Sequence, residues 1–124
     1  MGVVRVKDGV QFTKIAPGGF RILSTIDICA ASLPHDLTIT SACDGEHSGP
    51  NDPHHRGEAF DVRTHDLDPD RKDLILKSIQ GNLGTGFYAF LEDHGMDNEH
   101  FHIQVRKGTE YPPQILTDPE LSTT

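Results

Sequence analysis

The sequence predicts a small α+β domain with a largely antiparallel sheet and two main helices. Apolar residues recur at helical spacing over about 20–32, and residues 68–84 begin and end with helix-capping signals. Short runs that alternate apolar and polar residues, typical of strands, lie between and after these stretches. A chain of 124 residues can bury one modest core but not two, and neither a repeat nor a linker divides it. We therefore expect a single domain over residues 1–124.

The first half of the chain is expected to contain one helix and one strand. The apolar residues at helical spacing are Phe20, Leu23, Ile26 and Ala30. They lie between a glycine pair and Pro34, so the pattern predicts a helix over about 20–32. Residues 36–42, "DLTITSA", alternate in character and indicate a short strand. Residues 43–56 are rich in Gly, Pro, Asp, Asn and His, which is typical of a loop.

The second half adds a strand, a helix and a hairpin. Residues 57–63, "GEAFDVR", predict a strand with Phe60 and Val62 on one face and Asp61 on the other. "DPDRKDLILKSIQGNLG", residues 68–84, begins with an Asp-Pro cap signal and ends in glycine, as a helix does. "GFYAFLE" and "EHFHIQVRK" predict a final hairpin around "DHGMDN". The Pro- and Thr-rich residues 107–124 are expected to lie over the surface as a tail.

The charge and composition exclude several classes of partner. The net charge is −8, whereas nucleic-acid and anionic-membrane surfaces need clustered Lys and Arg, so we expect neither partner. No apolar run approaches the roughly 20 residues of a membrane span. "MGVVRVKDGVQF" lacks the apolar segment of a secretory signal, which predicts synthesis in the cytoplasm. Cys29 and Cys43 are too few for a disulfide framework and are not spaced as a metal clip.

Two pairs of histidines stand out, in "NDPHHRGEAFDVRT" (51–64) and "NEHFHIQV" (98–105). Asp61 lies seven residues after His54, with a glycine between them. This interval lets the chain turn and return as a strand, so that an imidazole and a carboxylate can converge. The two-residue period of a strand puts His100 and His102 on one face, and Phe101 and Ile103 on the other.

If the two strands are neighbours, His54, Asp61 and His102 provide three metal ligands. Two imidazoles and a carboxylate with an open fourth position are what a catalytic zinc ion requires. The other member of each histidine pair would serve the substrate or hydrogen-bond a ligand. A single loop histidine or surface acid would be ordinary, but the joint pattern favours a metal. The other histidines with no such context are expected to be solvated: His35, His65 and His94.

The two histidine segments resemble the motifs of a known family. "HHRGEAFD", residues 54–61, resembles the H-x-x-G-x-A-x-D signature of the zinc D-alanyl-D-alanine carboxypeptidases and dipeptidases, and "EHFH", residues 99–102, resembles their later E-x-x-H. Phage L-alanyl-D-glutamate endopeptidases and the hedgehog signalling domain share that fold. The resemblance covers about residues 37–106. It implies a hedgehog-type metallopeptidase fold and one zinc ion per chain at His54, Asp61 and His102, with His55 not a ligand.

The resemblance further implies hydrolysis of peptide bonds in bacterial peptidoglycan stems, as a carboxypeptidase or an endolysin-type endopeptidase. A carboxylate must then carry the proton from water to the leaving amine. Glu99 holds the E-x-x-H position, and Glu92 ends the preceding strand, as the corresponding acid does in hedgehog-like members. A regular strand would point Glu99 away from His102, whereas an irregular strand start would remove that objection. We expect Glu99 to be the base, with Glu92 as the alternative, and His100 to hydrogen-bond the substrate or the oxyanion.

Two departures from the family pattern concern substrate binding. Asp52 stands where the family often has Ser, and "TSACDGEHSG" lacks the arginine with which many members stabilise the developing oxyanion. His47 is a candidate donor in place of that arginine, or a loop histidine with no role. Arg63 shares the Asp61 face and is a candidate for binding a substrate carboxylate. The alternative for Arg63 is a surface ion pair with an aspartate of residues 64–70.

Two other functions stay open on the sequence. The chain could be a zinc-bearing binding module without catalysis, or a phage structural component whose metal is closed by a fourth ligand, His100 or His47. The peptidase hypothesis leads because an acid lies at the family offset. By analogy with the family, the small size and the absence of a basic wall-binding module fit a phage-encoded enzyme that acts on the cell wall after release.

Overall fold

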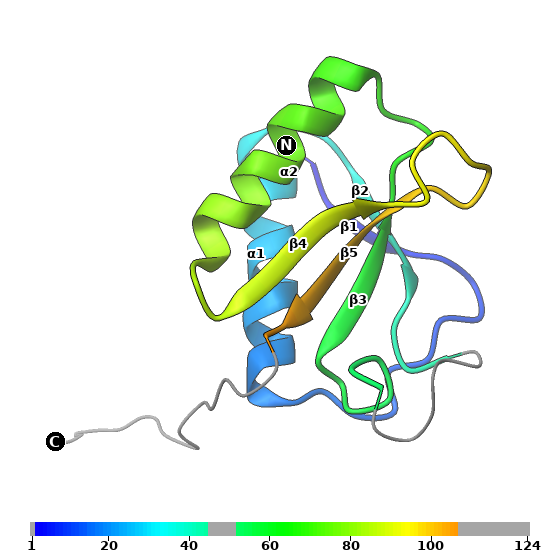
Figure 1. The fold of residues 1–124 in the computed structure, drawn as a ribbon, viewed down its shortest axis with the longest axis vertical. Helices are drawn as coiled ribbons and strands as arrows, with labels where there is room; N and C mark the ends of the chain where they lie inside the picture. Colours follow the sequence, from blue (N-terminus) through cyan, green and yellow to red (C-terminus); the bar gives the residue numbers. More distant parts are fainter. Residues whose placement is uncertain (1, 45–51, 107–124) are drawn as a thin grey trace, which may run out of the picture.

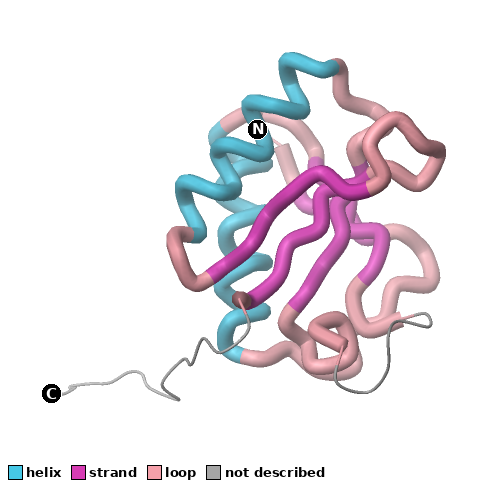
Figure 2. Tube along the Cα trace, viewed as in Figure 1, coloured by secondary structure: helices cyan, strands magenta, loops and turns pink. Residues whose placement is uncertain are grey.

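In the described part of the chain, two helices lie against one face of a five-stranded sheet, and no helix lies on the opposite face (Figures 1 and 2). The structure is a computed structural model that describes residues 2–44 and 52–106. The helices are α1 (Pro17–Ser32) and α2 (Pro69–Leu83). The strands are β1 (Val4–Val6), β2 (Leu37–Ser41), β3 (Ala59–Arg63), β4 (Phe87–Glu92) and β5 (His100–Val105). The predicted α+β class with two main helices is confirmed.

The sheet is mixed, not wholly antiparallel. Its order is β1-β2-β3-β5-β4, and β1 runs parallel to β2 while every other pair is antiparallel. The predicted antiparallel sheet therefore needs a correction at its β1 edge. β1 has only the three residues "VRV", two of which are exposed, so it lacks the alternation that identified the other strands.

Both helices begin and end close to their expected residues. α1 starts at Pro17, whose fixed φ suits the first helical turn, and so takes in the glycine pair that was expected to precede it. In α2, the Asp68 carboxylate accepts a hydrogen bond from the backbone N–H of Arg71 at 2.8 Å, which is an N-cap. Gly84 ends this helix with φ +87. No helix in residues 2–44 and 52–106 is long and apolar enough to cross a bilayer.

The core lies between the helices and the sheet. The apolar side chains of β3 and β5 that face the helices are fully or nearly fully buried: Phe60, Val62, Phe101 and Ile103. Ile22 and Ile26 of α1 and Ile75 and Ile79 of α2 meet them in one cluster. The residues that alternate with them along β3 and β5 therefore point to the opposite face of the sheet, which we call the bare face because no helix of the described residues covers it. Residues 45–51 of the expected loop and 107–124 of the expected tail lie outside the described residues.

Gly57 joins the turn before β3 to the start of α1. Its φ is +73, in the left-handed region that favours glycine. Its carbonyl oxygen accepts a hydrogen bond from the Ala16 N–H at 3.1 Å, and a Cβ here would collide with the Lys14 carbonyl. A Cβ on Gly19 would collide in turn with the Gly57 carbonyl. Glycine is therefore required at this position of the motif, because φ is positive and the Lys14 backbone leaves no space for a Cβ.

We expect Gly57→Ala to lower the free energy of unfolding by about 1–3 kcal/mol, because alanine must adopt the strained φ and displace backbone. Gly81→Ala is the matched control. Gly81 lies within α2, and a methyl group added to it would meet open space, so its replacement should raise stability by about 0.5–1 kcal/mol. Urea unfolding followed by circular dichroism measures both. Equal effects of the two substitutions would contradict the structural role of Gly57.

Candidate metal centre

The register of β3, β5 and β4 brings the polar residues of the bare sheet face into two rows. Asp61 pairs with His102 and Arg63 pairs with His100 across β3 and β5. Across β5 and β4, His100 pairs with Glu92. The expectations that the two strands are neighbours and that His100 and His102 share a face are both confirmed. The carboxylates of Asp61 and Glu92 and the imidazoles of His100 and His102 therefore lie close together on three adjacent strands.

His54 reaches the same point from the turn that precedes β3. Its Nε2 lies 3.4 Å from Asp61 Oδ1, and His102 Nδ1 lies 3.0 Å from the same oxygen. The ligand atoms of the three residues all lie within 4.8 Å of one another. Ligands of a tetrahedral zinc ion are about 3.3 Å apart, given metal–ligand bonds near 2.0–2.1 Å. The three side chains therefore need only small movements to hold one ion.

Both candidate histidines are oriented through their second ring nitrogen. His54 Nδ1 is 2.9 Å from the backbone carbonyl oxygen of Ala42, and His102 Nε2 is 2.7 Å from Gln104 Oε1. In the neutral form that can bind a metal, each imidazole would donate the proton on its outer nitrogen to that oxygen, and its other nitrogen, without a proton, would face Asp61. Metal-binding histidines are commonly held in this way. The residues present therefore fit a metal ion, and they fit it in the His₂Asp set predicted from the sequence.

The charge state of Asp61 suits a metal ligand. Burial on its own would raise the pKa of this carboxyl, but hydrogen bonds from His102 and His54 outweigh it, and the pKa falls well below its usual range. In His102, burial would lower the pKa, while the hydrogen bonds to Asp61 and Gln104 raise it. Asp61 is thus an anion at neutral pH, and an incoming metal must displace a proton shared with His102.

A second acid–imidazole pair adjoins these three residues. His100 Nε2 lies 2.8 Å from Glu92 Oε1, and His100 Nδ1 lies 2.7 Å from the carbonyl oxygen of Asn98. Because both ring nitrogens face acceptors, the imidazolium form satisfies both contacts. Burial would lower the pKa of His100, but the Asn98 carbonyl and the charges of Asp61 and Glu92 raise it. Glu92, His100 and His102 form a second group whose ligand atoms lie within 4.8 Å of one another.

Glu99 lies outside both groups of candidate ligands in residues 2–44 and 52–106. Its carboxylate accepts hydrogen bonds from Lys72 Nζ at 2.7 Å, Thr64 Oγ1 at 2.7 Å and the Gly95 N–H at 3.0 Å. The Lys72 ammonium, the Gly95 amide and the Thr64 hydroxyl together lower the pKa of Glu99 to about 2. β5 begins only at His100, and Glu99 turns toward α2, which is the orientation a regular strand gives.

The remaining sequence candidates are placed as follows. His47 lies outside the described residues. Asp52, at the position of the family Ser, accepts a hydrogen bond from the His54 backbone N–H at 2.9 Å and so supports the turn. His55 belongs to neither group of candidate ligands among the described residues. His65 and His94 are exposed as expected, whereas His35 is partly buried, 4.0 Å from an Asp66 oxygen.

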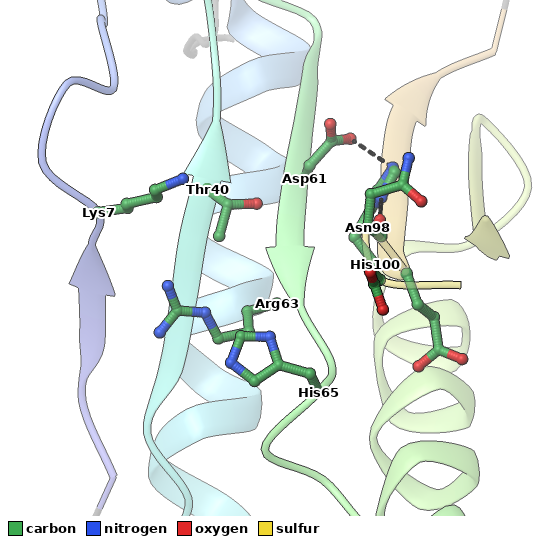
Figure 3. A pocket seen from close by; sticks show the side chains of 9 residues that line it. Lys7, Thr40, Asp61, Arg63, His65, Asn98 and His100 are labelled. Atoms are coloured by element: carbon green, nitrogen blue, oxygen red, sulfur yellow. Dashed lines mark hydrogen bonds and ion pairs between the residues drawn. The ribbon is translucent and has the colours of Figure 1, made fainter. Parts of the chain in front are cut away.

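A cavity of about 420 Å³ opens beside Asp61 and His100 (Figure 3). Thr40 of β2 and Lys7, which follows β1, contribute to its wall together with Arg63. The sequence did not predict this wall because β1 was not recognised as a strand. The expected ion pair between Arg63 and an aspartate of residues 64–70 is absent within the described residues. On the other side of the cluster, the Phe90 ring lies 5.3 Å from the His102 ring.

Comparisons of this chain with protein-family models, with curated proteins and with solved structures find no match. The interpretation of the site therefore depends on its own geometry and on the motifs in the sequence.

The Glu99 network predicts a pH dependence of stability. The pKa of Glu99 falls from an ordinary 4.5 to about 2 on folding, so its ionised form stabilises the folded state above pH 4.5. This contribution is lost as the pH falls from about 4.5 through about 2. We expect Glu99→Gln to be less stable than the parent at pH 6 and to lose less stability between pH 5 and pH 2.5.

Urea unfolding at both pH values measures this difference. Asp73→Asn is the control, because Asp73 forms an exposed pair with Lys77 and contributes little. A parent protein and a Glu99→Gln variant with the same loss of stability over this pH range would contradict the assignment.

Proposed function

We propose that the chain is a zinc-dependent peptidase that hydrolyses peptide bonds in the stems of bacterial peptidoglycan. The observation that carries the proposal is the convergence of His54, Asp61 and His102, whose outer contacts already aim the ligand atoms at one point. The peptidoglycan substrate rests on the resemblance of residues 54–61 and 99–102 to the carboxypeptidase and endopeptidase motifs. Carboxypeptidase and endopeptidase action are both compatible with those motifs.

His54 Nε2, Asp61 Oδ1 and His102 Nδ1 would hold the ion, because two neutral nitrogens and one carboxylate suit zinc and leave a position for substrate. When bound, zinc supplies Lewis acidity, which activates water and polarises the scissile carbonyl. The side of this cluster that meets the cavity is the side from which a peptide can approach. The chain must then supply a base for the water proton and a donor for the leaving amine.

Glu92 is the better candidate for that base. Its carboxylate lies on the bare face, is 42% exposed, and has His100 Nε2 as its close contact at 2.8 Å. A partly exposed carboxylate can accept a proton at one oxygen and deliver it to an amine. Glu99, the base expected from the motif, also lines the cavity, but its carboxylate is held by three donors, and its lowered pKa makes it a weak base. We therefore assign catalysis to Glu92 and a structural role to Glu99.

His100 provides the positive charge that the missing family arginine would provide. Its Nε2 is 3.6 Å from Asp61 Oδ1 and 2.8 Å from Glu92 Oε1, so it lies between the two carboxylates on the open face. As an imidazolium it orients Glu92 through its Nε2–H and adds a positive charge close to the carbonyl oxygen that develops negative charge. The cation at His100 and the base at Glu92 can thus act on one peptide bond from the same side.

A purely structural metal is the second candidate function, and the Glu92, His100 and His102 group favours it. If Glu92 or His100 joined the other three ligands, the coordination sphere would be closed and the domain would serve as a binding module or a phage structural component. The two functions differ in whether the metal site exchanges a water molecule and hydrolyses peptide bonds.

The first prediction for this function concerns the metal. The purified chain should bind one zinc ion, and His54→Ala should abolish stoichiometric binding, while His55→Ala should not. Affinity should fall as the pH is lowered, because the imidazoles must lose protons to bind. Inductively coupled plasma mass spectrometry after dialysis against a weak chelator measures the stoichiometry. Full zinc content in the His54 variant would overturn the ligand assignment.

The second prediction separates the two glutamates. Glu92→Gln should keep zinc and lower turnover by at least about 100-fold, the usual scale for the loss of a general base. Glu99→Gln should retain most turnover where it is folded. The assay is digestion of purified peptidoglycan with and without a chelator, followed by mass spectrometry of the released peptides. The reverse order of effects would return the base to Glu99, and cleavage that a strong chelator leaves unchanged would contradict the zinc peptidase.

A further inference from the structure

The cavity beside the candidate metal centre contains two basic side chains, Lys7 and Arg63. Figure 3 places Arg63 and His65 at one end of this cavity, with Thr40 and Lys7 along the side formed by the first two strands and Asp61 and His100 at the other end. Polar groups that can hydrogen-bond a ligand are therefore present on several sides of one cavity of about 420 Å³.

Arg63 differs from every other arginine in the described part of the chain. The others each have a partner: Arg5 with Asp36, Arg21 with the Asn82 carbonyl, Arg56 with Glu58, Arg71 with the Leu33 carbonyl, and Arg106 over the Tyr88 ring. Arg63 is partly buried, and it has no hydrogen bond or ion pair with any described residue. A partly desolvated guanidinium without a partner gains strongly from an anionic ligand, and it matches a carboxylate in a two-pronged geometry.

The carboxylates around the cavity leave this positive charge largely uncompensated. Asp61 is engaged by the histidines, and Glu99 is engaged by Lys72. Asp97 is exposed at the rim, where solvent screens it. Lys7, like Arg63, has no ion pair among residues 2–44 and 52–106. In a chain whose net charge is −8, Lys7 and Arg63 thus give this cavity two cations that can attract an anion.

The position of Arg63 sets how far the anion lies from the reacting bond. Arg63 follows Asp61 by two residues on the same strand and the same face, so their Cα atoms are about 7 Å apart. One residue of an extended peptide spans about 3.3–3.6 Å. With the reach of the arginine side chain, a carboxylate bound here lies within one or two residues of a peptide bond at His54, Asp61 and His102.

We propose that Lys7 and Arg63 bind a free carboxylate of the peptide substrate, close to the scissile bond, so that the enzyme prefers peptides ending in a carboxylate. This inference rests on the proposed peptidase function, which it makes more specific. Arg63 forms the paired hydrogen bonds, and Lys7 adds charge from the β1 side. His65 and Asn98 line the same cavity and can donate to the bound group.

A binding experiment tests the inference without requiring catalysis. The probes are N-acetyl-D-alanyl-D-alanine and the same dipeptide with a C-terminal amide, each titrated into the full chain, both metal-free and zinc-loaded. Nuclear magnetic resonance should show tighter binding of the acid than of the amide in both forms, with shifts of the Arg63 Nε–Hε signal. The preference should weaken as salt is raised.

Arg63→Gln should lower the affinity for the acid by about tenfold or more, which is the scale of a lost charged hydrogen bond. The affinity for the amide should change by less than about twofold. Arg63→Lys should restore only part of the preference, because lysine keeps the charge but not the paired geometry. Lys7→Gln should cause a smaller loss in the same direction. Arg21→Gln is the matched control, since it makes the same charge change on α1, outside the cavity.

In the zinc-loaded enzyme, Arg63→Gln should lower kcat/KM for the acid through KM, and by a much larger factor than kcat/KM for the amide. Equal binding of acid and amide to the parent protein, or an Arg21→Gln loss as large as that of Arg63→Gln, would overturn the carboxylate site. A chain that binds the acid preferentially but cleaves neither probe nor peptidoglycan would contradict the proposed peptidase and leave the carboxylate site standing.

Discussion

The candidate metal centre depends on the register between β3 and β5. Asp61 lies opposite His102 because Phe60 lies opposite Ile103 and Val62 opposite Phe101, and all four apolar side chains are buried on the other face. A slip by one residue would move His102 into the core and expose Phe101, since alternate residues change faces. The hydrophobic free energy of the core therefore holds two candidate metal ligands side by side. The third candidate ligand, His54, depends on the turn whose backbone Gly57 and Asp52 fix.

Local patterns in the sequence predicted most of this arrangement. Helical spacing before Pro34 located α1, the Asp-Pro cap signal and the final glycine located α2, and alternation placed His100 and His102 on one face of their strand and Asp61 opposite the buried residues of β3. Three features depend on contacts between distant segments, which local patterns do not contain. β1 is short and exposed and gains its strand conformation from pairing with β2, so Lys7 was not expected near the site. Asp68 caps α2 and Asp66 faces His35, so neither pairs with Arg63.

The third feature is the difference between the two glutamates, which a motif at fixed spacing cannot distinguish. Glu99 precedes the first residue of β5 and turns toward Lys72 of α2 and Thr64, where three donors stabilise its charge. Glu92 ends the neighbouring strand on the bare face and meets His100. Carboxyl groups whose surroundings differ this much perform different roles, because the environment sets their basicity and their access to substrate. The proximity of the E-x-x-H motif to His102 in sequence therefore does not by itself identify the base.

The bare face of the sheet has two different ends, and this asymmetry bears on how a peptide would lie. On the β1–β2 side of Asp61 are the basic side chains of Lys7 and Arg63. On the β4 side, the Phe90 ring packs 5.3 Å from the His102 ring, and Tyr88 and Arg106 continue beyond it. In the proposed peptidase, the first end would suit an anionic group of the substrate and the Phe90 ring an apolar group. A substrate with a carboxylate at one end would then lie across the strands, with its peptide bond near Asp61 and Glu92.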